Sequence, residues 1–297
     1  MRVIKSEPIT ILNTNVPETE PEWVAGTTYE QAAVVRYNHR VYKSIVAGNQ
    51  GNQPDVSPAS WMDQGATNPY RCIDEYVNSA TEHSSIEMTL PASRVGHVVF
   101  FGLSGTDLEL TFKDASGQVV SDQRINLMRY LSGGRYAVSW SEYFFGRKVR
   151  TATCISQLPF VGAATLGIRI TDAGGLPCRC SNIVLGYAQQ IGATQFGLAL
   201  SLEDYSKKIT DEFGRTFLRP GESVSVADCD LCIHPGQMDA VVRVINSLRG
   251  RAACWLLENE SPARHQSTTI YGFWDSFNMV LEGPGGYKYN MRIKGLI

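Results

Sequence analysis

The chain has 297 residues, of which 43 % are hydrophobic and 19 % charged, and its formal net charge is −2. This composition is typical of a globular protein and excludes a chain that is disordered throughout. Lysine and arginine form no basic stripe or polybasic segment, and no apolar run approaches the roughly 20 residues that span a bilayer, so we expect neither nucleic-acid binding nor membrane insertion. The length predicts two or three domains.

Residues 1–20 are rich in Thr, Asn, Pro and Glu and predict an extended N-terminal arm without a core of its own. The first residues lack the apolar segment and the small-residue cleavage site of a signal peptide, so secretion by that route is not expected. Seven cysteines are an odd number, which fits folding in a reducing compartment better than a framework of disulfides.

Residues 21–68 predict a small module built on three strands. The stretch "VVRYNHRVYKSI", residues 34–45, has the alternation of a hairpin, and a loop rich in Gly, Asn, Pro and Ser follows it. Flat aromatic rings can stack on sugar rings, and four residues are candidates for that role: Trp23, Tyr37, Tyr42 and Trp61. A core this small needs the same rings inside it, so both uses stay open.

Residues 69–190 predict an antiparallel β-sandwich. Short alternating runs such as "SIEMTL", "LELTFKD" and "TLGIRI" are separated by turn motifs such as "SGTD", "DASGQ" and "DAGG". No run here combines helical periodicity with caps, so we expect no helix in this segment and no doubly wound nucleotide-binding fold.

Residues 191–297 predict a β-sheet or barrel domain that carries one α-helix and serves in assembly. The helix is expected at about residues 236–249, because apolar residues recur there at helical spacing and Gly250 suits its end. These residues are Met238, Val241, Val242, Ile245 and Leu248. The last strand, "YNMRIKGLI", is expected to offer an open edge to a neighbouring subunit.

The sequence offers little for catalysis. Phosphate-binding loops and the G-x-S-x-G nucleophile motif do not occur, and the five histidines are isolated from one another. We therefore expect no enzymatic activity and no cofactor. The nearest approach to a zinc site is Cys178 and Cys180 with Cys229 and Cys232, but C-x-C paired with C-x-x-C departs from a zinc ribbon, and ordinary buried cysteines explain them equally. The prediction is no metal.

Two resemblances add to this interpretation. The pattern of Trp, Tyr and Val from Trp23 to Trp61 resembles small carbohydrate-binding modules of the chitin-binding type, although the exposed Trp usual after the second strand is missing. From Trp23 onward, ordered motifs such as "WMDQGATNPYRCIDEYVNS", "NIVLGYAQQIGATQFG" and "YGFWDSF" look like a family of tailed-bacteriophage and prophage tail-tip proteins.

The second resemblance implies a function. It implies a structural component of a phage tail tip or baseplate that is folded in the host cytoplasm, resides in the virion and contributes to host attachment. Its expected partners are other tail proteins and further copies of itself in a threefold or sixfold assembly around the tail axis. The alternative hypothesis is a glycan-binding adhesin that recognises a host-surface polysaccharide.

Overall fold

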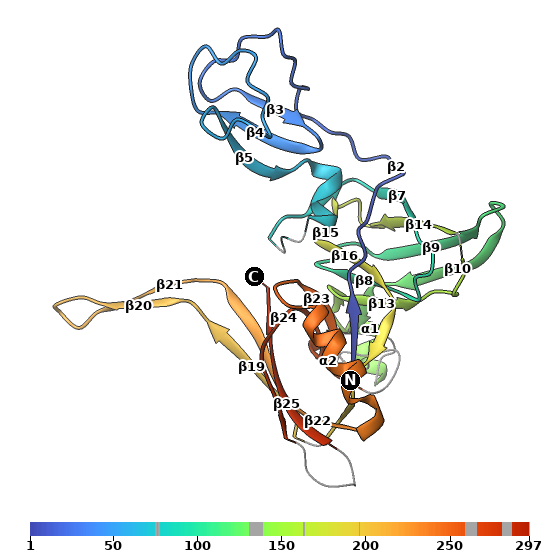
Figure 1. The fold of residues 1–297 in the computed structure, drawn as a ribbon. Helices are drawn as coiled ribbons and strands as arrows, with labels where there is room; N and C mark the ends of the chain where they lie inside the picture. Colours follow the sequence, from blue (N-terminus) through green and yellow to red (C-terminus); the bar gives the residue numbers. More distant parts are fainter. Residues whose placement is uncertain are drawn as a thin grey trace.

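The computed structural model describes residues 1–74, 76, 78–130, 139–162, 164–195, 197–258, 266–280 and 287–296. The fold is mainly β, as predicted, and is made of several antiparallel sheets (Figure 1). In the described ranges no sheet closes into a barrel, so the C-terminal part is an open sheet. The small N-terminal module stands away from a layered body, and a long hairpin leaves the body at its other end (Figure 1).

The module is a three-stranded sheet formed by consecutive strands. Its strands are β3 (Val34–Tyr37), β4 (Arg40–Ser44) and β5 (Trp61–Ala66), in that order. Asn38 and His39 connect the first two with positive φ angles of 48° and 59°, the backbone of a two-residue type I′ hairpin turn. A short 3₁₀ helix, η1 (Asn68–Ile73), follows and forms the neck that joins the module to the body.

The outer layer of the body is a five-stranded antiparallel sheet. Its strand order is β10 (Val119–Asn126), β9 (Asp107–Asp114), β14 (Ala164–Thr171), β7 (Ile86–Pro91) and β2 (Asn13–Thr14). Burial alternates along β7, β9 and β14, as expected of strands with one face on a core. The alternating sequence runs therefore correspond to this layer.

The middle layer is a three-stranded sheet in which two strands are buried along their whole length. These strands are β8 (His97–Phe101) and β16 (Asn182–Gly186), and β13 (Cys154–Gln157) completes the sheet. Val98 and Phe100 face the core shared with the five-stranded sheet, whereas Val99 and Phe101 face a second apolar cluster with residues of the C-terminal sheet. This layer is thus covered on both faces.

The third layer is the large C-terminal sheet. Its order is β17 (Ala188–Gln190), β1 (Arg2–Lys5), β23 (Ala253–Leu256), β24 (Thr269–Val280), β25 (Tyr287–Gly295), β22 (Ser223–Ile233) and β18 (Ala193–Thr194), and β19 (Ala199–Asp204) also pairs with β22. The predicted helix is present as α2 (Met238–Ser247), and its Val241 and Ile245 are buried in one cluster with Trp255 of the sheet. Two 3₁₀ turns, η2 (Pro235–Gln237) and η3 (Gln266–Thr268), flank these elements.

Short two-stranded ladders complete the described fold. One joins β6 (Thr81–His83) to β15 (Cys178–Cys180), and another joins β20 (Lys207–Thr210) to β21 (Thr216–Arg219). A third joins β11 (Met128–Tyr130) to β12 (Lys148–Arg150), and it carries a helix, α1 (Trp140–Phe145). The expectation of no helix between residues 69 and 190 was therefore wrong. Its missed signal is the capping box Ser139-x-x-Glu142, in which the Ser139 hydroxyl accepts from the Glu142 N–H.

Residues 1–20 are not a free arm. Strand β1 lies between β17 and β23, with Val3 opposite Trp255 and Ile4 opposite Cys254. Val3 and Ile4 are 1 % and 0 % exposed and face opposite sides of the sheet, one toward α2 and the other toward the middle layer. The segment therefore runs extended from the C-terminal sheet, through β2 in the five-stranded sheet, to the module (Figure 1).

The last strand also differs from expectation. Residues 287–295 form β25, which is hydrogen-bonded to β24 on one side and to β22 on the other. Its predicted open edge does not exist, because both of its ladders are occupied within the chain. Strand β25 therefore has no free edge to which another chain could pair along Tyr287–Gly295.

Candidate functional site

The module places two of its four candidate stacking residues inside. Tyr42 is 6 % exposed and Trp61 is 2 % exposed, and with Val35 they form the module core. The Trp61 indole N–H donates to the carbonyl of Asn52 at 2.8 Å, and Tyr29 meets the Trp61 ring edge to face at 5.4 Å. Neither Tyr42 nor Trp61 presents a ring face to an outside sugar, so their candidacy is corrected to a core role.

The other two candidates form a half-buried pair. The rings of Trp23 and Tyr37 lie 5.5 Å apart at 84°, an edge-to-face contact, at the margin of the module core. The backbone N–H of Trp23 donates to the carbonyl of Arg36, which fixes the incoming chain on β3. The structure therefore splits the four predicted residues into a buried pair and a marginal pair, and only the marginal pair can reach a ligand.

A polar junction built on Glu18 fastens the module to the segment that precedes it. The Arg36 guanidinium donates to one Glu18 carboxylate oxygen at 2.6 Å. The other oxygen accepts from the Thr67 hydroxyl at 2.7 Å and lies 2.8 Å from His39 Nδ1. Burial opposes ionisation of Glu18, but these hydrogen bonds and the nearby charges outweigh it and lower its pKa.

His39 extends this junction to the neck. Its ring stacks on Tyr70 of η1 with centroids 4.0 Å apart and planes 20° apart. Thr67 belongs to the same region, because it is the residue before η1 and its N–H donates to the carbonyl of His39. The hairpin turn, the neck and residue 18 thus meet in one place, which sets where the module sits.

The candidate zinc cysteines do not come together. Cys178 and Cys180 are buried in the core between the five-stranded and middle sheets, whereas Cys229 is buried in the cluster under α2. Burial raises the pKa of Cys180 and raises that of Cys229 to about 12, as expected of thiols in apolar surroundings. The described residues hold no group of three or more potential ligands placed for a metal. The paired-cysteine zinc candidate is therefore not formed.

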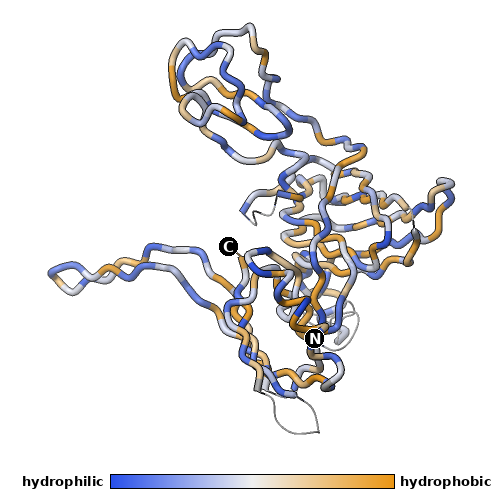
Figure 2. Tube along the Cα trace, in the orientation of Figure 1, coloured by the Kyte–Doolittle hydropathy of each residue, from blue (hydrophilic) through white to orange (hydrophobic). Residues whose placement is uncertain are grey.

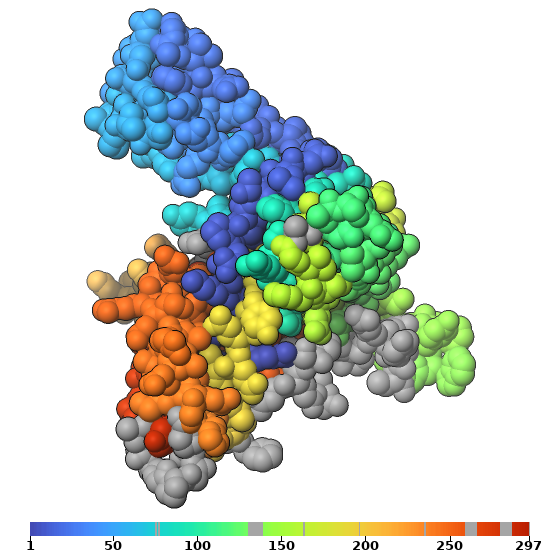
Figure 3. Space-filling model, turned by 45° about the vertical axis from the view of Figure 1, so that its right-hand side comes forward, coloured from blue at the N-terminus to red at the C-terminus, as the bar shows by residue number. Residues whose placement is uncertain are grey.

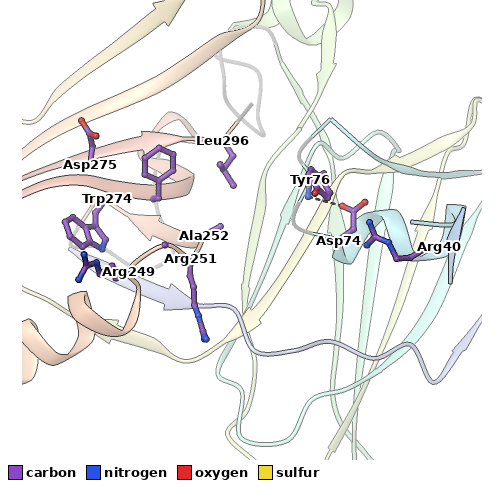
Figure 4. Close-up of a pocket in the computed structure, with 11 residues that line it drawn as sticks. Arg40, Asp74, Tyr76, Arg249, Arg251, Ala252, Trp274, Asp275 and Leu296 are labelled. Atoms are coloured by element: carbon purple, nitrogen blue, oxygen red, sulfur yellow. Dashed lines mark hydrogen bonds between the residues drawn. The ribbon is translucent and has the colours of Figure 1, made fainter. Parts of the chain in front are cut away.

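A wide cleft of about 800 Å³ lies between the neck and the C-terminal sheet (Figure 4). Arg40, Asp74 and Tyr76 line one wall, and Arg249 and Trp274 lie on the other. The hydrogen bond drawn in Figure 4 runs from the Tyr76 backbone N–H to the Asp74 carboxylate and stays within one wall. Arg40 is held by Asp63 at 2.7 Å. The cleft is an open gap between two parts of the chain, with charges of both signs.

The most distinctive surface is a hairpin formed by residues 199–222. We call this hairpin the arm from here on, and it is separate from the N-terminal segment, residues 1–20. Its first strand β19 pairs with the N-terminal half of β22, residues 223–228. Its distal part is the ladder of β20 and β21. Asp211 closes the distal turn by accepting from the N–H groups of Phe213 and Arg215. Every residue of β20 and β21 is exposed, and in Figure 1 the two strands extend away from the body. With a rise of about 3.3 Å per residue, the part beyond β19 projects on the order of 30 Å.

Exposed apolar side chains occur on both faces of the arm, among lysine, arginine and threonine. Residues directly opposite one another in an antiparallel ladder share a face, so Ile209 and Phe217 lie on one face and Leu218 on the other. Figure 2 shows hydrophobic stretches on both strands of the arm. Its large exposed apolar residues are Leu200, Leu202, Tyr205, Ile209, Phe213, Phe217 and Leu218. All eight residues of β20 and β21 are exposed, so neither face of this ladder is buried against the described part of the chain.

The root of the arm is held by a charge cluster. Lys294 Nζ donates to Glu203 at 2.6 Å and to the Tyr205 hydroxyl at 2.7 Å, and Arg292 donates to Glu203 at 3.1 Å. The hydrogen bond from Lys294 is the main reason that the pKa of Glu203 falls, and the same bond raises the pKa of Lys294 to about 12. The arm therefore leaves the sheet from a defined anchor on β25.

Comparison with known proteins adds no relative. Neither a scan against protein-family models nor a search of the curated proteins found a match to this chain. None of the helices in the described ranges has the length and apolar character needed to cross a bilayer.

Proposed function

We propose that the protein is a structural component of a phage tail tip or baseplate, and that copies of it assemble symmetrically around the tail axis through the arm. The observation that carries the proposal is the arm itself, a two-stranded ribbon whose apolar residues lie on both faces and are exposed. The resemblance of the sequence to tail-tip proteins supplies the setting. Other tail proteins are the further partners, and the virion is the site of action.

A ribbon of this kind needs a partner. An isolated two-stranded hairpin is marginally stable in water, and the arm ends in strands with no buried residue. Phe213 at its turn is 85 % exposed and Leu202 near its root is 73 % exposed. Burying such side chains against a second surface would stabilise the arm by about 1.5 to 3 kcal/mol for each fully buried residue. An assembly supplies that surface.

The resemblance to tail-tip proteins is the reason that we propose a ring and not a two-fold dimer. An arm that leaves one end of the sheet and binds a different surface on the next copy makes a head-to-tail contact, which closes into a ring when the rotation permits. The ribbon also exposes the backbone groups along its outer edges, to which a strand of the next copy can add. Threefold or sixfold closure is the expectation for a tail tip.

Light scattering coupled to gel filtration tests the assembly. The wild-type chain is expected to form trimers or hexamers, visible as rings by negative-stain microscopy. A variant in which residues 206–220 are replaced by two glycines keeps the anchoring Glu203 and Tyr205 and is expected to be monomeric. Phe160→Ser, a change at a residue that is 66 % exposed on the body, is the matched control and should assemble normally.

The proposal fails if the wild-type chain stays monomeric at tens of micromolar, or if the arm-truncated variant assembles as the wild type does. A second test addresses location. A gold-labelled antibody against the protein should mark the tail tip of intact particles, and label found only on free protein would contradict the virion assignment.

The alternative, a glycan-binding adhesin, rests on Trp23 and Tyr37. They are the two predicted stacking residues that the fold leaves half exposed, at the margin of the module. The full chain applied to a glycan array should then bind a host-surface polysaccharide, and Trp23→Ala should abolish binding while Met62→Ala, at an exposed module residue, should not. Absence of binding by the folded wild-type chain would remove this alternative.

A further inference from the structure

Helix α1 presents four aromatic rings to solvent. Trp140 is 79 % exposed and Phe145 is 85 % exposed, with Tyr143 and Phe144 above 60 %. No residue of the helix is buried. The rings contact one another: Trp140 stacks with Phe144 at 6.1 Å, and Tyr143 meets Phe144 edge to face at 5.1 Å. Contiguous exposed apolar surface of this kind marks an interaction site.

The helix is fixed locally and held away from the body. The capping box of Ser139 and Glu142 begins it, and the Gly146 N–H donates to the Glu142 carbonyl at its end. In the sequence the helix lies between β11 and β12, whose ladder closes the base of this excursion of the chain. Figure 3 shows these residues, light green at the lower right, standing clear of the sandwich. The rings are therefore presented at a projecting tip, not along a flat face.

The distribution of the rings around the helix indicates the kind of partner. At 3.6 residues per turn, positions 140, 143, 144 and 145 spread over an arc of about 200°. A helix that docks in a protein groove buries a narrower stripe at i, i+3, i+4 and i+7. A medium that surrounds the tip contacts the whole arc, and a lipid interface is such a medium.

The chemistry of the tip also fits a bilayer surface. Trp and Tyr combine an apolar ring with a polar N–H or O–H and are enriched at the boundary between headgroups and acyl chains. Arg147 and Lys148 come after the helix and its C-cap Gly146 and are exposed, where the chain returns to the body. Cations next to an inserted apolar tip complement anionic headgroups.

We propose that the α1 tip inserts its aromatic side chains into the interfacial region of a lipid bilayer that carries anionic headgroups. No segment of the chain has to span the bilayer for this contact. The proposal therefore changes the expectation of no membrane insertion at the α1 tip alone, where the insertion is shallow. The proposal is independent of the arm, which lies on a different sheet. The tip and the assembly surface can therefore be tested separately.

Co-sedimentation with vesicles tests the proposal on the full chain. Wild-type protein is expected to bind vesicles of phosphatidylcholine with phosphatidylglycerol, and more weakly those of phosphatidylcholine alone or in high salt. The double variant with Trp140→Ser and Phe145→Ser should bind at least about tenfold more weakly, since two exposed rings lose their burial. Phe160→Ser is the matched control, because Phe160 is 66 % exposed and belongs neither to the tip nor to the arm, and it should bind as the wild type does.

Fluorescence gives a site-specific readout. Trp140 is the most exposed of the five tryptophans, so brominated lipids should quench its emission, and Trp140→Phe should remove the quenched component while binding persists. The arm-truncated chain should still bind vesicles, which separates failure of this proposal from failure of the assembly proposal. Unchanged circular dichroism of the double variant shows that it is folded.

The proposal is overturned if folded wild-type protein ignores anionic vesicles, or if the double variant binds them equally well. It is also overturned if the double variant changes the size of the assembly and leaves vesicle binding unchanged, because the tip would then be a contact between protein copies. Loss of vesicle binding by Phe160→Ser, with binding retained in the double variant, would move the lipid contact from the tip to the body.

Discussion

The module and the arm are two small antiparallel extensions of one body, and they use their apolar residues in opposite ways. The module turns Val35, Tyr42 and Trp61 inward and packs further aromatics around them. The arm has apolar side chains of similar size and exposes them on both faces. The module widens its hairpin with a third strand, β5, and the loop between β4 and β5 accepts a hydrogen bond from the core ring of Trp61 through Asn52, whereas the distal arm remains a two-stranded ribbon.

This difference shows what a hairpin needs in order to form its own core. Three strands with a covering loop can enclose rings on one side, but two strands leave both faces in water. Substitutions at the buried residues of the module should therefore remove packing and destabilise it. Substitutions at the exposed residues of the arm should leave the chain folded. The predictions below test this distinction with matched changes.

The largest effect is expected for Ile245→Asp in α2. Ile245 is 2 % exposed against the C-terminal sheet, so the change buries an unpaired carboxylate and should destabilise this region by more than about 4 kcal/mol. The same change at Ile209 of the arm, which is 42 % exposed, should alter the free energy of unfolding by less than about 0.5 kcal/mol. Denaturant titration of both variants measures this. A folded, stable Ile245→Asp chain would contradict the docking of α2.

The next effect is expected for Trp61→Ala in the module. Removing this buried ring should cost about 3 to 5 kcal/mol, which is enough to unfold so small a core. Hydrogen exchange measured by mass spectrometry should show fast exchange in β3 to β5 and unchanged protection in the body. Phe213→Ala in the arm should change neither. Retained protection of β3 to β5 in Trp61→Ala would show that the module does not depend on its aromatic core.

The smallest effect is expected for Glu18→Gln at the junction. The loss of charge-assisted hydrogen bonds with Arg36, His39 and Thr67 should destabilise the module by about 1 to 2 kcal/mol. The fold holds the pKa of Glu18 below its ordinary 4.5, so its contribution is complete above that value and is lost as the pH falls through the lower folded value. Hydrogen exchange of β3 and β4 between neutral and acid pH measures it. An acid-induced loosening of equal size in Glu18→Gln would assign the dependence to other groups.

Local periodicity predicted much of the fold. The alternation in "IEMTLP" and "DLELTFKD" corresponds to β7 and β9, whose buried residues alternate as expected. The helical spacing of Val241 and Ile245 identified α2, and its observed bounds fall inside the predicted 236–249. Helix α1 was missed because its four aromatics face water, so it has no apolar and polar faces to detect, and only its capping box marks it.

The candidate sites were less predictable because burial is decided by packing. Trp61 in the module core and Trp140 at the tip are the same residue type, but their side chains are 2 % and 79 % exposed. Likewise, Cys178 and Cys229 are similar cysteines in the sequence but are buried in separate cores. Residue type and spacing do not determine which of these groups can reach a ligand.

The sequence by itself determined the β-rich class, the hairpin at residues 34–45 and the position of the C-terminal helix, because these depend on alternation, turn residues and spacing among near neighbours. Only the tertiary structure decided that Arg2–Lys5 completes the C-terminal sheet, that β8 and β16 form a layer covered on both faces, and that the arm is left uncovered. Val3 lies opposite Trp255, although the two residues are far apart in the sequence. Such pairing follows from the packing of whole layers and not from any pattern within β1.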